Sequence, residues 1–135
     1  MNKKIVAIVA LALVLVFAFA GCTKGDALIL PSSERVNKIE LDVTNVRKVD
    51  ITDSHHIADI ISNLERHAKP TNKDSVNDQP VNLSKYIIIN IVDKDNNMTT
   101  IYLYKAGGRF YIEKPYQGIW RTDEDTYNSI AKLII

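Results

Sequence analysis

An unbroken apolar run over residues 5–20 divides this 135-residue chain into two unequal parts, because it ends at Gly21 and at the one cysteine, Cys22. Lys3 and Lys4 precede the run. A membrane-spanning helix needs about 20 apolar residues, so this shorter run with a basic start is typical of a secretory signal. A single cysteine cannot form an internal disulfide, so everything after Cys22 must fold around an apolar core.

The residues Phe19-Ala20-Gly21-Cys22 resemble a bacterial lipobox, although Phe19 stands where that motif usually has leucine. The resemblance implies that residues 1–21 are a lipoprotein signal peptide, that the thiol of Cys22 carries a lipid, and that the new amino terminus is acylated with a chain such as palmitate. Because more than one acyl chain anchors a protein stably, we expect it on the extracytoplasmic side of the cell membrane. Two alternatives stay open: an ordinary secretory signal cleaved elsewhere, and an uncleaved N-terminal anchor.

The charge balance is close to neutral. The chain has 17 basic and 16 acidic side chains, and removal of Lys3 and Lys4 with the signal leaves 15 against 16. A nucleic-acid partner is not expected, since such proteins carry a strongly basic face. No polybasic run follows Cys22, so lipid headgroups are not an expected second target.

Hydrophobic periodicity predicts the fold of the remainder. Residues 22–33 are expected to form a tether, because Gly25, Asp26 and Pro31 break any period, and residues 34–135 a single domain. Alternation with a period of two predicts strands, and apolar positions three and four residues apart predict helices. The expected strands cover residues 36–43, 48–51, 85–93, 99–105 and 109–113, with a short sixth one at 119–120, and the expected helices cover residues 53–69 and 122–134.

The expected class is α+β, with one antiparallel sheet of about five to six strands and two helices on one face. The order along the chain is strand, strand, helix, strand, strand, strand, helix. Asp53 or Thr52 is expected to cap the first helix and Thr122 the second. The expected core contains Ile60, Ile61, Leu64, Ile87, Ile89, Ile91, Ile101, Leu103 and Ile130. Residues 69–83 form a polar loop, and loops of that length are usually functional or disordered.

Two clusters resemble a family of small Firmicutes lipoprotein domains that is known only as a domain of unknown function. One is residues 75–78 with Pro80, and the other is residues 111–113, 115–116 and 118–120. The likeness extends from about Ile29 to the C-terminus. It implies a Gram-positive cell surface, and it transfers neither an activity nor catalytic residues.

Metal and cofactor sites are not expected. Asp93, Asp95 and Asn97 have the spacing of a calcium loop, but Met98 and Tyr104 stand where that loop needs glycine and glutamate. A hairpin turn explains the three residues without calcium.

The histidines and the cysteine do not form a recognisable site either. His55, His56 and His67 are too widely spaced on the first helix to hold one zinc ion. There is no G-x-S-x-G motif of a serine nucleophile. The thiol of Cys22 is expected to carry the lipid and is therefore not a candidate nucleophile.

Two classes of function remain. The first is a non-enzymatic binding or accessory module that recognises a peptide, another protein or a cell-wall component through aromatic side chains on the second face of the sheet. That candidate surface contains Tyr86, Tyr102, Tyr104, Tyr111, Tyr116 and Trp120. The same rings have a structural interpretation, in which they cover the sheet or pack under the long loop.

The second class is a surface hydrolase that acts on the cell wall. It requires two carboxylates to converge in a cleft, from among Asp74, Asp78, Asp93, Asp95 and Glu113. A further interpretation makes the released signal peptide the active product and the domain a spacer. We expect the binding module rather than an enzyme.

Overall fold

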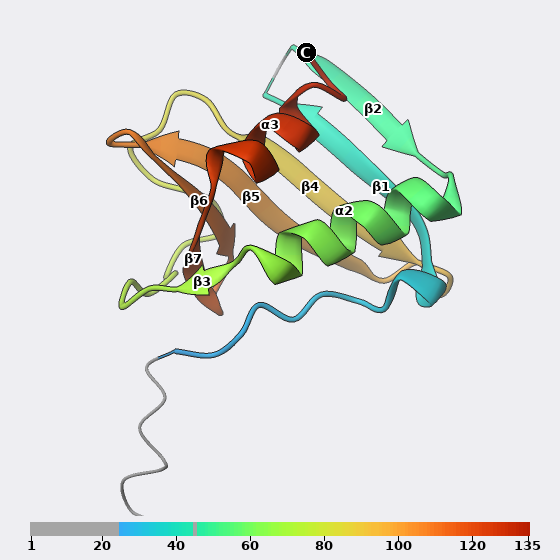
Figure 1. Cartoon of the computed structure of the whole chain (residues 1–135), viewed down its shortest axis with the longest axis horizontal. Coiled ribbons are helices and arrows are strands. Elements are labelled where there is room, and N and C mark those ends of the chain that lie inside the picture. Colours follow the sequence, from blue (N-terminus) through green and yellow to red (C-terminus); the bar gives the residue numbers. More distant parts are fainter. Residues whose placement is uncertain (1–24, 45) are drawn as a thin grey trace, which may run out of the picture.

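The computed structural model describes residues 25–44 and 46–135, which form one β-sheet with helices packed against it (Figure 1). Cys22 and the residues that resemble a lipobox lie outside this part. Its elements, in chain order, are η1 (Ser33–Arg35), β1 (Val36–Val43), β2 (Arg47–Ile51), α2 (Ser54–Arg66), β3 (Lys69–Pro70), β4 (Ile87–Asp93), β5 (Met98–Ala106), β6 (Arg109–Lys114), β7 (Gly118–Thr122) and α3 (Glu124–Ala131).

The strands form one sheet in the order β2-β1-β4-β5-β6-β7-β3, and every neighbouring pair is antiparallel. Strands β4 to β7 follow one another as a meander. Gly107 and Gly108 join β5 to β6 with φ angles of +57° and +75°, as the tight hairpin turn predicted from this pair requires. The α+β class is therefore confirmed.

The predicted strand count and order are wrong, because the sheet has seven strands. The additional strand β3 is only two residues long, and Lys69 and Pro70 pair with Arg121 and Trp120 of β7. A pair of residues shows no alternation, and proline is tolerated in a strand at the edge of a sheet, where its missing N–H costs no ladder bond. Periodicity could not detect this strand.

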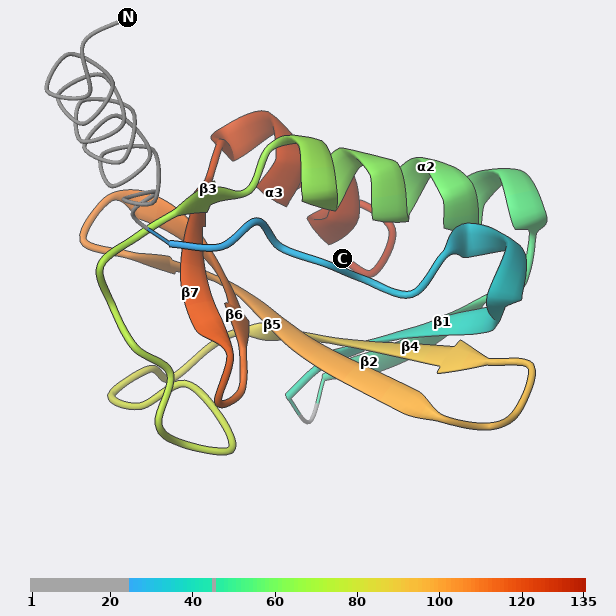
Figure 2. The ribbon, with the colours of Figure 1, turned by 90° about the horizontal axis from the view of Figure 1, so that it is seen from below.

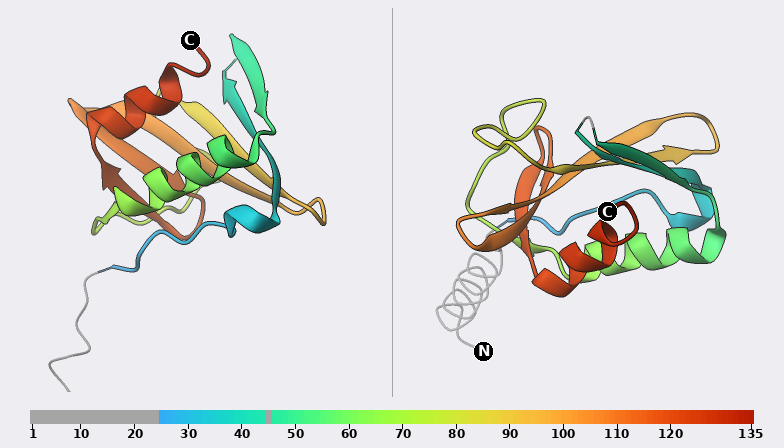
Figure 3. Two further views of the ribbon diagram at one scale, coloured as in Figure 1. Left: turned by 45° about the vertical axis from the view of Figure 1, so that its right-hand side comes forward. Right: turned by 90° about the horizontal axis from the view of Figure 1, so that it is seen from above.

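Both helices lie on the same face of the sheet (Figure 2). The N-terminal segment before β1 runs beside α2 (Figures 2 and 3). Among the described residues, no helix is long and apolar enough to cross a membrane.

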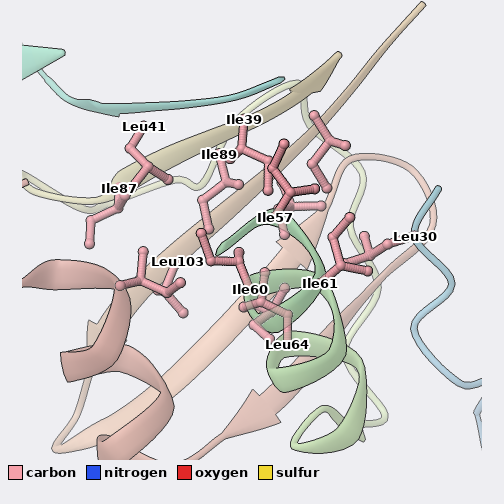
Figure 4. Packing of buried hydrophobic residues seen from close by; sticks show 14 of the residues in the cluster. Leu30, Ile39, Leu41, Ile57, Ile60, Ile61, Leu64, Ile87, Ile89 and Leu103 are labelled. Atoms are coloured by element: carbon pink, nitrogen blue, oxygen red, sulfur yellow. The ribbon is translucent and has the colours of Figure 1, made fainter. Parts of the chain in front are cut away.

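The main core lies between the sheet and the helices (Figure 4). All nine predicted core residues are buried there, which confirms the periods assigned to these segments. Fully buried side chains come from β1, β4, β5 and β6 and from both helices. They include Ile39, Leu41, Ile57, Leu64, Ile87, Ile89, Ile91, Ile101, Leu103, Ile112 and Ile130.

The N-terminal cap of α2 agrees with the sequence-based prediction, and that of α3 differs from it. Asp53 caps α2, since its Oδ1 accepts a hydrogen bond from the backbone N–H of His56 at 2.9 Å. The cap of α3 is Asp123, which accepts from the N–H of Thr126 at 2.7 Å, rather than Thr122. Thr122 is the last residue of β7, so pairing with β6 takes precedence over capping there.

The segment that was expected to be a tether packs on the domain. Leu28 and Leu30 are buried in the main core, and the indole Nε1 of Trp120 donates to the carbonyl oxygen of Asp26 at 2.8 Å. The Nζ of Lys114 donates to the carbonyl of Ile29 at 3.0 Å. The packed part of the chain therefore extends N-terminally of the boundary expected at residue 34.

Candidate functional site

On the face of the sheet opposite the helices, residues 71–86, here called the covering loop, lie against the end of the sheet that contains β6 and β7 (Figure 2). Beneath it, Tyr102, Tyr104 and Tyr111 form a second buried apolar cluster, which is separate from the main core. Strand register explains why these rings meet. Tyr104 of β5 lies opposite Tyr111 of β6, and Tyr102 lies opposite Glu113, so all four side chains point to the same face.

Glu113 is the polar centre of this cluster. Its side chain is buried, with only 5% of the residue exposed. One carboxylate oxygen accepts a hydrogen bond from Ser75 Oγ at 2.8 Å, and the other accepts from the Tyr104 hydroxyl at 3.1 Å. The backbone N–H of Tyr116 donates to Ser75 Oγ at 3.3 Å. Buried carboxylates are tolerated when they are hydrogen-bonded in this way, so Glu113 joins the covering loop to the sheet.

Tyr104 must stay neutral in this environment. Burial raises the pKa of its phenol far above 10.0, and the Glu113 carboxylate adds to the shift. Burial also raises the pKa of Tyr102. Both rings therefore serve as protonated, packed side chains at any physiological pH.

Further contacts fix the outer part of the covering loop. The Tyr116 hydroxyl donates to Asp78 Oδ1 at 2.7 Å, which raises the pKa of Tyr116. The Lys73 ammonium lies 4.7 Å from the centre of the Tyr111 ring, and the ring of Tyr86 meets that of Tyr102 edge-on at 5.4 Å. The loop is thus held along its length although it has no regular structure.

The six residues of the expected aromatic surface do not form one open face. Tyr102, Tyr104 and Tyr111 lie together but are buried, and Tyr86 is half-buried beside them. Tyr116 is exposed.

Trp120 lies on the other face of the sheet, which corrects its assignment to this surface. It pairs with Ile112 in β6 and shares the helix-covered side with it, in the main core. The pairing register of β7 with β6 determines which face Trp120 occupies. The sequence around Trp120 has no long alternating pattern from which this face could be predicted.

A cavity of about 200 Å³ lies between the covering loop and the sheet. Two of the five candidate acids, Asp74 and Glu113, line it together with Tyr104 and Tyr111. The hydrolase hypothesis requires two carboxylates to converge in one cleft, and these two acids meet the part of that requirement that concerns a shared cavity. Asp78 is bound to the Tyr116 hydroxyl instead.

The remaining two candidate acids shape the β4–β5 turn. Asp93 Oδ1 accepts hydrogen bonds from the backbone N–H groups of Asp95 and Asn97, each at 2.9 Å. Both hydrogen bonds lower the pKa of Asp93, and the bond from Asn97 makes the largest contribution. Residues 25–44 and 46–135 contain no group of three or more His, Cys, Asp or Glu side chains that could hold a metal ion.

The sequence contained a partial signal for the pair that closes this site. Glu113 follows Tyr111 at the strand period, on the same face as the rings, so an acid was already placed among inward-facing aromatics. Ser75 had no periodic signal, because it lies in a polar segment without a period, and only the family resemblance of residues 75–78 marked it. Only the tertiary structure brings residues 75 and 113 together.

Fold and site define a class of small α+β domain: a seven-stranded antiparallel sheet with two helices on one face and a loop, held by a buried glutamate, on the other. The chain belongs to the DUF5301 family, described as "Domain of unknown function (DUF5300)", whose model matches residues 24–121. This range includes both Ser75 and Glu113.

A solved structure supports the same fold. The NMR structure of the protein from Ruminococcus gnavus is 36% identical to this chain, covers 75% of this chain and 99% of its own, and superposes with a TM-score of 0.63. No curated protein matches the sequence.

Proposed function

We propose that this protein is a lipoprotein, anchored through Cys22 on the extracytoplasmic side of the cell membrane, whose domain binds a protein, a peptide or a cell-wall component without catalysing a reaction. The apolar run that ends at Gly21 and Cys22 supports the anchor. The covering loop supports binding, and it is the observation on which the proposal rests.

The covering loop has the properties of a preorganised recognition element. Buried hydrogen bonds through Ser75 hold it on the sheet, yet it exposes two apolar side chains, Val76 at 68% and Val81 at 57%. Exposed Tyr116 is hydrogen-bonded to it through Asp78. A loop that is already ordered loses less entropy when a partner binds, and long ordered loops commonly carry function.

A wall-directed hydrolase is the second candidate, favoured by the cavity that Asp74 and Glu113 share. Two observations weigh against it. The cavity of about 200 Å³ is smaller than typical ligand pockets of roughly 300–1,000 Å³. Both oxygens of Glu113 already accept hydrogen bonds from the protein, so this carboxylate is engaged in holding the loop. Release of soluble fragments from purified cell walls by the wild type, abolished in Asp74→Asn, would favour the hydrolase.

The anchor is tested by metabolic labelling with a fatty-acid analogue. We expect the wild-type chain to be labelled and processed, and Cys22→Ala to accumulate as an unlabelled precursor. Label retained in Cys22→Ala would exclude this site of lipidation.

The binding surface is tested by photo-crosslinking in living cells. A photoreactive amino acid replaces Val76 or Val81 in the covering loop, and Val46 serves as the matched control because it is 78% exposed in the turn between β1 and β2. We expect one discrete crosslinked species from positions 76 and 81 and none from position 46. The same products from all three positions would contradict a recognition role for the loop.

A further inference from the structure

A larger pocket, with a volume of about 530 Å³, lies where the end of α2, β3, the β5–β6 turn and the start of α3 meet. Its lining is strongly basic, although these residues are scattered through the sequence. Five basic side chains contribute to it: Arg66, His67, Lys69, Arg109 and Arg121. We refer to it below as the basic pocket.

The positive charges of the basic pocket are only partly neutralised by acids of the domain. Four side chains are permanently positive, against two acids, Asp123 and Glu124, so an excess of two positive charges remains. Within the described residues, none of the five basic side chains has an ion-pair partner within 4.0 Å. The Asp123 carboxylate is already engaged as the cap of α3.

The chemistry of the lining indicates the kind of ligand. Arg66, Arg109 and Arg121 each carry a planar guanidinium group with several N–H donors. Such groups bind carboxylate or phosphate oxygens through paired, charge-assisted hydrogen bonds. A pocket with three guanidinium groups and excess positive charge is suited to an anion with oxygen atoms, such as a phosphate ester.

The position of the pocket relative to the start of the domain indicates the source of that anion. Gly25 lies directly against Pro70, since a Cβ added to Gly25 would come 2.6 Å from the Cβ of Pro70. Pro70 follows Lys69, which lines the pocket. Cys22 precedes Gly25 by three residues, a reach of at most about 11 Å. A lipid on Cys22 would therefore hold this edge of the domain at the membrane surface.

We propose that the basic pocket binds the headgroup of an anionic phospholipid, so that the domain lies on its own membrane with β3 and the end of α2 toward the bilayer. The inference rests on the proposed anchor at Cys22. An anchored domain meets headgroups at high effective concentration, and each basic residue near an anionic surface contributes attraction. The nearly neutral net charge of the chain does not predict this pocket, because its basic residues come together only in the folded structure.

The test uses the full chain as cells process it, placed in vesicles of phosphatidylcholine with or without phosphatidylglycerol. A water-soluble acylating reagent modifies exposed lysines, and mass spectrometry measures the rate at each one. Lys48 is the internal reference, because β2 lies at the opposite edge of the sheet from β3. We expect Lys69 to react about fivefold more slowly when phosphatidylglycerol is present, and Lys48 to be unaffected.

Two variants with the same change in net charge locate the effect. Arg66→Gln, Arg109→Gln and Arg121→Gln together remove the pocket charges, and the combined variant should lose the protection of Lys69. Arg47→Gln, Lys94→Gln and Lys132→Gln together remove three exposed charges elsewhere, and should keep it. Protection that survives in the first variant would overturn the proposal.

Three further outcomes also bear on the proposal. Equal reactivity of Lys69 in both vesicle types overturns it. Protection by soluble glycerol phosphate in phosphatidylcholine vesicles also overturns it, because the pocket would then bind free phosphate esters. The mass of the purified chain reports lipidation separately. Protection of Lys69 in a chain without lipid would therefore support the headgroup site even if the proposed anchor failed.

Discussion

At the scale of single residues, Glu113 explains how the covering loop is held on the second face of the sheet. It is an acid on a strand whose neighbours at the same face are tyrosines, and it is buried because Ser75 and Tyr104 each donate a hydrogen bond to it. A buried carboxylate that lost these donors would carry a large desolvation cost. The covering loop and the aromatic cluster therefore depend on each other through one side chain.

We expect Glu113→Gln to lower the free energy of unfolding by about 1–3 kcal/mol, because an amide presents N–H groups where Ser75 and Tyr104 both need an acceptor. Urea titration followed by tyrosine fluorescence measures this change. Asp74→Asn is the control, since Asp74 is an exposed acid beside the same cavity, and it should change the stability by less than about 0.5 kcal/mol. Equal stabilities of the two variants would show that the carboxylate does not hold the loop.

At the scale of elements, α2 and α3 are each preceded by a capping aspartate whose carboxylate accepts a backbone hydrogen bond. These bonds to His56 and Thr126 are the first cause of the lowered pKa values of Asp53 and Asp123. A lowered pKa in the folded state means that the native protein binds protons less readily than the unfolded chain. The stabilisation by the caps is therefore present at neutral pH and is lost as the pH falls below the ordinary value of 3.8.

Asp123→Ala tests the cap of α3. We expect a loss of about 1 kcal/mol at pH 7, which shrinks as the pH is lowered below 3.8, because protonation removes the same interaction from the wild type. Thermal unfolding at a series of pH values measures both effects. Asp125→Ala removes an acid from the same turn without removing the cap, and a loss as large as that of Asp123→Ala would argue against the assignment.

At the scale of the whole molecule, one sheet carries two different layers. Helices α2 and α3 cover one face with an aliphatic core, and the covering loop packs on part of the other face over tyrosines and Glu113. The N-terminal segment belongs to the first layer through Leu28 and Leu30. A lipid anchor at Cys22 would consequently be joined to the domain by a very short connection, and this constrains how the domain can face the membrane.

The alternation between Leu28 and Ile29 tests this packing. Leu28 is 3% exposed and Ile29 is 71% exposed. Leu28→Ala should destabilise the domain by about 2–5 kcal/mol through loss of buried surface and the cavity that remains, whereas Ile29→Ala should change the stability by less than about 0.5 kcal/mol. Chemical denaturation of both variants provides the measurement. Two equally stable variants would mean that residues 22–33 act as the flexible tether suggested by their composition.

The sequence alone determined the features that depend on neighbours along the chain. Periods of two and of three to four residues located the central strands, both helices and the nine core residues, because side-chain direction in a strand or helix repeats at fixed intervals. The glycine pair at residues 107–108 predicted the β5–β6 hairpin for the same local reason. The α+β class followed from the order of these elements.

Only the tertiary structure decided the features that depend on residues far apart in sequence. Strand register decided two of them, the short edge strand β3 and the burial of Trp120 beside Ile112. A third is the hydrogen bond between Ser75 and Glu113, which are 38 residues apart. The basic pocket arises in the same way, from charges on four separate elements. Such contacts leave no period in the sequence, because their energy comes from packing and hydrogen bonding between segments that meet only in the folded chain.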